Sequence, residues 1–408
     1  MPIKKIRPSA KKINSAVARL SLPSADGNLG GVAKPAPISA APKLQSGKVV
    51  EELPGSSRVS LRCILAAVAI IIFPLMALPW ALETHEFYKQ ILLGLIVAVG
   101  LIFVLSDILR QGEFTLIPRH VLVPLGLATL GLGFISALRS GLFFNGFFGY
   151  GGTEPLALVT MLLLGLWITL SFQGGRESFG LMYKALAVSG SLLSLVTLIS
   201  LAGIRLYWFI PTPGWVPAGP TNVAGIIAVA TVVLLMGLLA RSRRAPWYFW
   251  LALAPPLIFL FGLNFRTLWI ILALGMGAFL FLGFWKKFQI AKTATIAMTI
   301  IAVLAILGAT TNLIPAFLTT PLEVAPAHQE TWSVVRQTLA QSPLFGSGPA
   351  TFAQDYLRFR SGPILQTPFW NVAFDWGSSA ALTFLGTFGW VGGLLMLATV
   401  LSVLFFLP

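Results

Sequence analysis

Residues 221–240 read TNVAGIIAVATVVLLMGLLA, a run of twenty residues without a charged side chain. At 1.5 Å per residue such a helix is about 30 Å long, which matches the hydrocarbon thickness of a bilayer. Similar apolar runs recur from Leu61 onward. The predicted membrane spans cover residues 61–82, 91–109, 119–138, 155–172, 179–202, 221–240, 246–264, 266–284, 293–313 and 379–407. The sequence therefore predicts an all-α polytopic membrane protein with about ten transmembrane helices.

The composition supports this class. The chain is 56% hydrophobic and only 10% charged, unlike an ordinary soluble domain. As the only cysteine, Cys63 cannot form an intramolecular disulfide, and we assign it no role. The sequence has no nucleotide-binding strand–turn–helix pattern and no closely spaced set of metal ligands. We therefore expect neither a cofactor nor a bound metal.

Residues 1–60 form a basic N-terminal tail. Eleven of the 28 Lys and Arg residues lie within residues 1–62, together with three acids. The tail is rich in Pro, Ala, Ser and Gly and has no apolar periodicity, so we predict that it is disordered. A basic segment before the first span ordinarily sets the topology and contacts anionic lipid. We favour this role over nucleic-acid binding. By the positive-inside rule, the basic tail places the N-terminus in the cytoplasm.

With that orientation, the basic residues divide unequally between the two faces of the membrane. Every inner loop is basic, as the positive-inside rule requires. The outer segments hold one lysine and six thinly spread arginines: Lys89, Arg139, Arg205, Arg266, Arg336, Arg358 and Arg360. A guanidinium can grip two phosphate or carboxylate oxygens at once, so the set suggests recognition of such a group. For any single arginine, snorkelling at a helix end or contact with lipid headgroups is the better explanation, and only the set favours phosphate or carboxylate recognition.

Spans one to nine are predicted to occupy residues 61–313, and a long outer loop, residues 314–378, precedes the last span at 379–408. Within the loop, TWSVVRQTLAQ (331–341) predicts a short helix, and AQDYLRFR (353–360) predicts a second amphipathic segment. Its apolar face is expected to hold Trp332, with Arg336 beside that face in a sheltered groove. The chain stops at Pro408 directly after the last span, which leaves open further spans or a C-terminal domain.

Four short motifs together resemble the O-antigen ligase and O-antigen polymerase superfamily of bacterial membrane glycosyltransferases. In the outer loop, Trp332 is followed by SPLFGSGPATF (342–352). The other three motifs are GPTNVAGIIAV (219–229), NFRTLWI (264–270) and GTFGWVGGLL (386–395). The resemblance covers about residues 64–405.

The resemblance implies a reaction and a location. The reaction is transfer of a glycan from an undecaprenyl-pyrophosphate carrier to a glycan, lipid or protein acceptor, on the outer side of the cytoplasmic (inner) membrane. The expected partners are the lipid-linked oligosaccharide donor, the acceptor and membrane lipids. Loss of a lipid pyrophosphate develops negative charge, which arginines can stabilise in a water-poor site without a metal. We therefore expect a metal-independent enzyme.

The base that deprotonates the acceptor hydroxyl is open among four residues. The family usually places a histidine after the long loop, but FWNVAFDWGSSAALTFL (369–385) contains none. The candidates are His328, Asp375, Glu330 and Asp355, and the first two are preferred. The expected pyrophosphate ligands are Arg266, Arg336, Arg358, Arg360 and Arg205, and the first two are expected to matter most. Trp332 and Glu154 complete the expected substrate contacts.

Two other functions stay open. A flippase for lipid-linked sugars also needs outer arginines, but it usually shows an internal repeat and ionisable residues near mid-membrane, and the sequence shows neither. A catalytically inactive family member is the third possibility, because the family's histidine motif is missing.

Overall fold

The structure is a computed structural model that describes residues 61–77, 85–112, 122–149, 156–171, 176–207, 209–210, 214–241, 246–285, 290–311, 316–320 and 324–406. The predicted tail, residues 1–60, and the predicted substrate contact Glu154 lie outside these residues. All regular secondary structure in the described residues is helical, without strands, as predicted.

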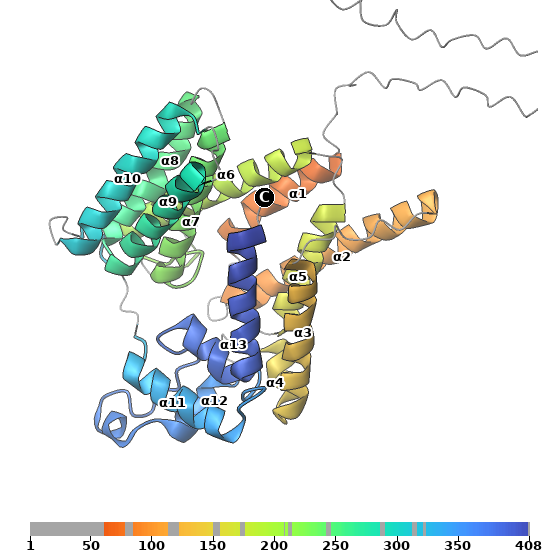
Figure 1. The fold of residues 1–408 in the computed structure, drawn as a ribbon, viewed down its shortest axis with the longest axis vertical. Coiled ribbons are helices and arrows are strands. Elements are labelled where there is room, and N and C mark those ends of the chain that lie inside the picture. The colour runs from red at the N-terminus through yellow and green to blue at the C-terminus, as the bar shows by residue number, and fades with distance from the viewer. Residues whose placement is uncertain are drawn as a thin grey trace, which may run out of the picture. The chain divides into compact units, whose positions relative to one another are not determined.

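The helices follow the chain in simple order (Figure 1). They are α1 (Leu61–Ile72), η1 (Phe73–Leu75), α2 (His85–Gln111), α3 (Leu122–Arg139), α4 (Phe143–Phe148), α5 (Leu156–Ser171), α6 (Arg176–Leu201), α7 (Thr221–Arg241), α8 (Trp247–Leu263), α9 (Arg266–Trp285), α10 (Lys292–Thr310), α11 (His328–Gln341), α12 (Phe352–Phe359), η2 (Gly362–Gln366) and α13 (Ala380–Phe406).

Six of the described helices are long and apolar enough to cross a membrane. The qualifying segments are Tyr88–Arg110, Gly180–Leu201, Thr221–Arg241, Arg266–Trp285, Lys292–Thr310 and Ala380–Ser402. Shorter apolar helices occupy Cys63–Leu75, Pro124–Arg139, Leu156–Ile168 and Trp247–Leu263. Each of the ten predicted spans thus contains a helix, and the multi-pass character is supported, while the number ten stays a prediction.

The first predicted span, residues 61–82, does not form one continuous α-helix. Helix α1 ends at Ile72 and passes into the 3-10 turn η1, because Pro74 has no backbone N–H for a helical hydrogen bond. In α8, by contrast, the helix continues through Pro255 and Pro256, which membrane helices tolerate where neighbouring groups satisfy the freed backbone carbonyls.

Helices α6 to α10 share one apolar core. Helix α6 packs on α1, α7 and α8, and α9 packs on α7 and α10. The side chains of Phe259, Trp269, Met276 and Met298 are fully buried there. Small residues let the helices approach closely: a Cβ on Gly190 of α6 would lie 1.9 Å from the Thr231 hydroxyl of α7. Packing of apolar side chains therefore holds this core together.

A second set of helices surrounds α3 and α13, which pack side by side (Figure 1). Helix α3 also contacts α4 and α5, and α13 also contacts α11 and α12. Helices α11 and α12 form both amphipathic segments predicted for the outer loop, and α11 starts three residues earlier than predicted. Their small core contains Val334, Val335, Leu339, Phe352 and Tyr356.

Helix α13 is interrupted at Gly389, where the backbone has φ 67° and ψ −168°. An unbroken helix would bond the N–H groups of Trp390 and Val391 to the carbonyls four residues earlier. Here these N–H groups donate to the carbonyls of Pro343 and Leu344, at 2.9 and 3.2 Å. Helix α13 thus occupies the predicted span 379–407, but it is not a regular helix at this point.

The segment Pro343–Gly348, which we call the docked turn, fills the interruption. The carbonyls that the break sets free in α13, those of Gly386 and Thr387, accept the N–H groups of Ser347 and Gly348 at 3.2 and 2.9 Å. Two helical hydrogen bonds are thus replaced by four bonds to the docked turn, so these backbone groups stay paired at the break. Ser136 of α3 adds a hydroxyl bond of 2.6 Å to the Phe345 carbonyl.

Candidate functional site

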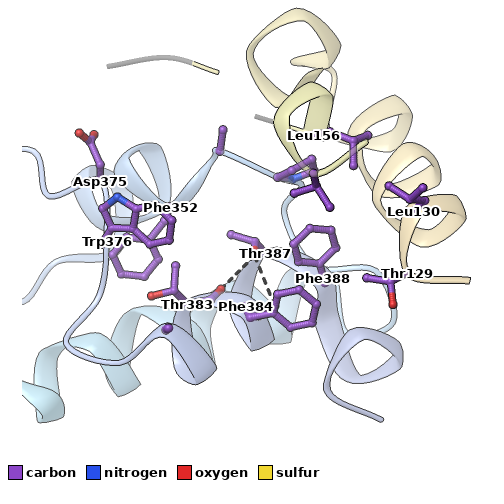
Figure 2. A pocket seen from close by; sticks show the side chains of 14 residues that line it. Thr129, Leu130, Leu156, Phe352, Asp375, Trp376, Thr383, Phe384, Thr387 and Phe388 are labelled. Carbon is purple, nitrogen blue, oxygen red and sulfur yellow. Dashed lines mark hydrogen bonds between the residues drawn. The ribbon is translucent and has the colours of Figure 1, made fainter. Parts of the chain in front are cut away.

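An apolar pocket of about 210 Å³ lies where helices α3, α5 and α13 meet the segments that flank α12 (Figure 2). The helices contribute aliphatic and aromatic side chains, among which Phe384 and Phe388 stack with ring centroids 4.4 Å apart. The described lining residues are Thr129, Leu130, Leu156, Val159, Pro349, Ala350, Phe352, Asp375, Trp376, Ala380, Thr383, Phe384, Thr387 and Phe388. Membrane helices and the polar loop therefore share one site.

Asp375 is the one charged side chain among the described lining residues. It lies at one end of the lining, beside Trp376 and Phe352, while Leu130 lies at the other end (Figure 2). Partial burial raises the pKa of the Asp375 carboxyl above its ordinary value, because an apolar environment disfavours the ionised form. A carboxylate with a raised pKa is a stronger base than an ordinary aspartate.

The turn that carries Asp375 is fixed on both sides. The N–H of Ser378 donates to the Thr331 hydroxyl of α11 at 2.9 Å, and the N–H of Gly377 donates to the Thr383 hydroxyl of α13 at 3.0 Å. A Cβ at position 377 would lie 2.4 Å from the Thr331 methyl group, so only glycine fits. The position of Asp375 is consequently set by two helices.

His328, the other preferred base, belongs to the same corner of the structure. It is the first residue of α11, and its Nδ1 lies 2.5 Å from the hydroxyl of Ser378, three residues after Asp375. The imidazole is exposed and does not line the pocket. The structure therefore brings the two preferred residues to one segment, with Asp375 at the pocket and His328 outside it.

The two remaining base candidates have structural partners. Glu330 is buried and accepts 2.6 Å hydrogen bonds from both the N–H and the hydroxyl of Ser361. Asp355 accepts a hydrogen bond from Ser347 of the docked turn. Burial raises the pKa of Asp355 to about 6, although hydrogen bonds from Ser347 and Thr338 lower it in part. Neither carboxyl lines the pocket.

The predicted pyrophosphate ligands do not gather around the pocket. None of the described lining residues is an arginine. Arg205, Arg266, Arg336 and Arg358 are exposed, and Arg360 is half-buried with its guanidinium donating to the carbonyl of Trp370. The Arg358 guanidinium lies 5.1 Å from the centre of the Phe359 ring.

The prediction that Arg336 lies in a sheltered groove is wrong. Helix α11 buries Thr331, Val334, Val335 and Thr338, so the opposite face, with Arg336 and Trp332, is exposed. The mistake came from counting Trp332 as part of the apolar face. Hydroxyl-bearing threonines occupy that face instead, because they bond to the helix backbone or to Ser378.

Several residues of the site were not foreseen. Trp376 adjoins Asp375 in the lining, and Ser136 and Ser347 fix the docked turn. Arg139 lies with its guanidinium 5.2 Å from the centre of the Phe345 ring in that turn. A signal for Ser136 was available, since a serine within an apolar span needs a hydrogen-bond partner.

The observations define the class of the protein as a multi-pass α-helical membrane protein. Comparison with known proteins adds no narrower identification: no protein-family model, curated protein or solved structure gave a significant match to this chain. The O-antigen ligase and polymerase resemblance consequently rests on the short motifs alone.

Proposed function

We propose that the protein is a glycosyltransferase of the O-antigen ligase and polymerase type. It moves a glycan from an undecaprenyl-pyrophosphate carrier to an acceptor hydroxyl on the outer side of the cytoplasmic membrane. The observation that carries the proposal is the partly desolvated Asp375 carboxylate at the end of an apolar pocket that membrane helices and the polar loop build together. A lipid-linked reaction needs this combination of apolar surface and polar chemistry.

In the proposed reaction, Asp375 takes the proton of the acceptor hydroxyl while the acceptor oxygen bonds to the anomeric carbon. The bond between that carbon and the pyrophosphate oxygen breaks, and undecaprenyl pyrophosphate leaves with the bonding electrons. Asp375 then releases its proton to water. The raised pKa of Asp375 favours the first step, because the transfer of a hydroxyl proton to a stronger base is less uphill.

The leaving pyrophosphate needs positive charge, which the outer arginines supply in this proposal. Arg360 and Arg358 belong to the same loop as Asp375, and Arg139 contacts the docked turn. These three are therefore better placed candidates than Arg266, at the start of α9, or Arg205. Arg336 stays in the proposal as an exposed side chain on α11 that is free to turn toward a bound diphosphate.

A flippase remains the second candidate, because of the interruption in α13. Discontinuous membrane helices often mark the substrate sites of transporters, where backbone groups at the break bind the substrate. In this chain, however, the groups at the break bond to the docked turn and are not available to a ligand. The filled break favours a fixed site over alternating access.

Mass spectrometry of lipid-linked and finished glycans separates the candidates. Cells without the protein should lose a finished surface glycan and accumulate its lipid-linked precursor on the outer leaflet. Re-expression of the wild-type protein should restore the glycan, whereas Asp375→Asn should not. Accumulation on the inner leaflet alone would favour the flippase. Restoration by Asp375→Asn, together with outer-leaflet accumulation in the deletion, would leave the transferase but remove Asp375 as its base.

A further inference from the structure

We infer that the Asp375 pocket binds the head and first carbons of an uncharged, hydroxyl-bearing lipid, and that the donor's pyrophosphate binds outside it. The ligand class follows from the lining alone. The assignment of this pocket to the acceptor, and not to the donor, rests on the proposed function.

The described lining contains few side-chain hydrogen-bond donors. Its three threonine hydroxyls all donate to backbone carbonyls of their own helices or of the residue that precedes the helix. Thr129 donates to Leu125 at 2.9 Å, Thr383 to Ser379 at 3.0 Å, and Thr387 to Thr383 at 3.0 Å. Figure 2 shows the Thr387 bonds along α13. These hydroxyls therefore offer no proton to a bound phosphate.

The charge of the described lining is unfavourable for an anion. An anion needs cations or several donors around it, but the described lining provides one carboxylate and no cation. A phosphate beside Asp375 would meet a like charge in a water-poor site, where such repulsion is poorly screened. The pocket is thus unsuited to the pyrophosphate head of the donor.

An uncharged hydroxyl group does fit this end of the pocket. The carboxylate of Asp375 accepts hydrogen bonds, and the indole N–H of the neighbouring Trp376 is the remaining side-chain donor of the described lining. An alcohol is both donor and acceptor, so it can bond to both groups at once. Trp376 is 41% exposed, which leaves part of the indole accessible at this end of the pocket.

The apolar lining and the volume of the pocket suit part of a lipid chain. Away from Asp375 the lining is formed mainly by Leu130, Leu156, Val159 and the rings of Phe384 and Phe388. This surface suits an alkyl or isoprenoid chain. The volume of about 210 Å³ is below that of pockets that enclose a whole drug-sized ligand, which measure roughly 300–1,000 Å³. The pocket therefore holds the head-proximal part of a lipid.

Cysteine protection in lipid nanodiscs tests this inference without any turnover. The reporter is Val159→Cys in a Cys63→Ala background, and the probes are decyl glucoside, decyl phosphate and decyltrimethylammonium, which share a chain length. Decyl glucoside should protect the introduced thiol from a maleimide at concentrations at least about tenfold lower than decyl phosphate does. Ile102→Cys, an exposed position of α2 in the lining of a mainly apolar groove, reports the partitioning of each probe into the bilayer.

Two further variants sharpen the test. Asp375→Asn should improve protection by decyl phosphate about tenfold relative to decyl glucoside, because the like charge is gone. Trp376→Phe should weaken protection by decyl glucoside severalfold, whereas Trp250→Phe, a similarly exposed tryptophan on α8 outside the lining, should not.

Three results would overturn the inference: equal or better protection by decyl phosphate in the parent protein, best protection by the ammonium probe, or no change with Asp375→Asn. The outcome is independent of the proposed activity. A pocket that selects decyl glucoside in a protein without transferase activity would keep the ligand class and remove the proposed function.

Discussion

Two regions of this molecule are stabilised in different ways. The core of α6 to α10 consists of apolar side chains such as Phe259, Leu272 and Met276, which are fully buried between helices. The polar region, which we define as residues 324–391, has a much smaller apolar core. It buries Glu330, Thr331, Thr338 and Thr351 as well, and hydrogen bonds satisfy them.

This contrast indicates in which region a functional site is expected. Apolar packing is tolerant, since side chains of similar volume can replace one another at modest cost. A buried polar network is demanding, because each unpaired group costs free energy. A membrane protein that retains such a network has a reason to fix geometry at that place. In this chain the network holds the docked turn and the segment with Asp375.

The largest expected effect comes from glycine substitutions that contrast the two regions. Gly389→Ala should destabilise the protein by about 3 kcal/mol or more, because its backbone conformation is nearly exclusive to glycine. A Cβ there would also lie 2.4 Å from the Leu344 carbonyl. Gly277→Ala in α9, where a Cβ meets nothing within 4 Å, should be neutral or slightly stabilising. Thermal unfolding in detergent compares them, and equal losses would show that the docked turn contributes no special constraint.

A smaller effect concerns Asp355, whose pKa of about 6 in the folded protein exceeds the ordinary value of 3.8. Folding therefore favours the protonated acid. The contribution of Asp355 to the free energy of unfolding falls as the pH rises from about 4 to about 6, and it is constant above pH 6. Asp355→Asn removes the ionisation and should be more stable than wild type above pH 6, by at most about 3 kcal/mol. The advantage should disappear near pH 4. Parallel melting curves across this range would contradict the buried-acid interpretation.

Substitutions of the arginines are expected to have the next largest effect, which is on the rate of transfer. If the polar region holds the donor's pyrophosphate, Arg360→Lys should reduce transfer about tenfold, since lysine keeps the charge but loses the planar fork. Arg266→Lys, at the edge of the apolar core, should reduce it less. This order revises the expectation from sequence, which placed Arg266 and Arg336 first. A larger loss at Arg266, measured at matched expression, would place the donor site across both regions.

Much of the fold could be predicted because its cause is local. Runs of apolar residues long enough for a bilayer specify helices, and each of the ten predicted spans contains one. Helices α11 and α12 also followed from local amphipathicity and turn residues. The break at Gly389 could not be predicted in this way. The break depends on a turn more than forty residues earlier in the chain, whose carbonyls replace the helix's own acceptors.

The candidate site was predicted only in part for the same reason. Asp375 and His328 were identified from residue type, but their link through Ser378 depends on how α11 meets the start of α13. The arginine set was drawn from a charge pattern, which gives a face of the membrane and no distances. Trp376 was overlooked because a tryptophan near a span is most often part of an interfacial belt.

We propose Asp375, and not the partly buried Asp355 that bonds to the docked turn, as the base of a lipid-linked glycan transfer. The most direct measurement is the initial rate of transfer from an undecaprenyl-pyrophosphate-linked glycan by purified protein in nanodiscs, for wild type, Asp375→Asn and Asp355→Asn. We predict a loss of about 10²–10³-fold for Asp375→Asn and a rate within severalfold of wild type for Asp355→Asn. Wild-type transfer by a folded Asp375→Asn protein, or loss only in Asp355→Asn, would contradict the account.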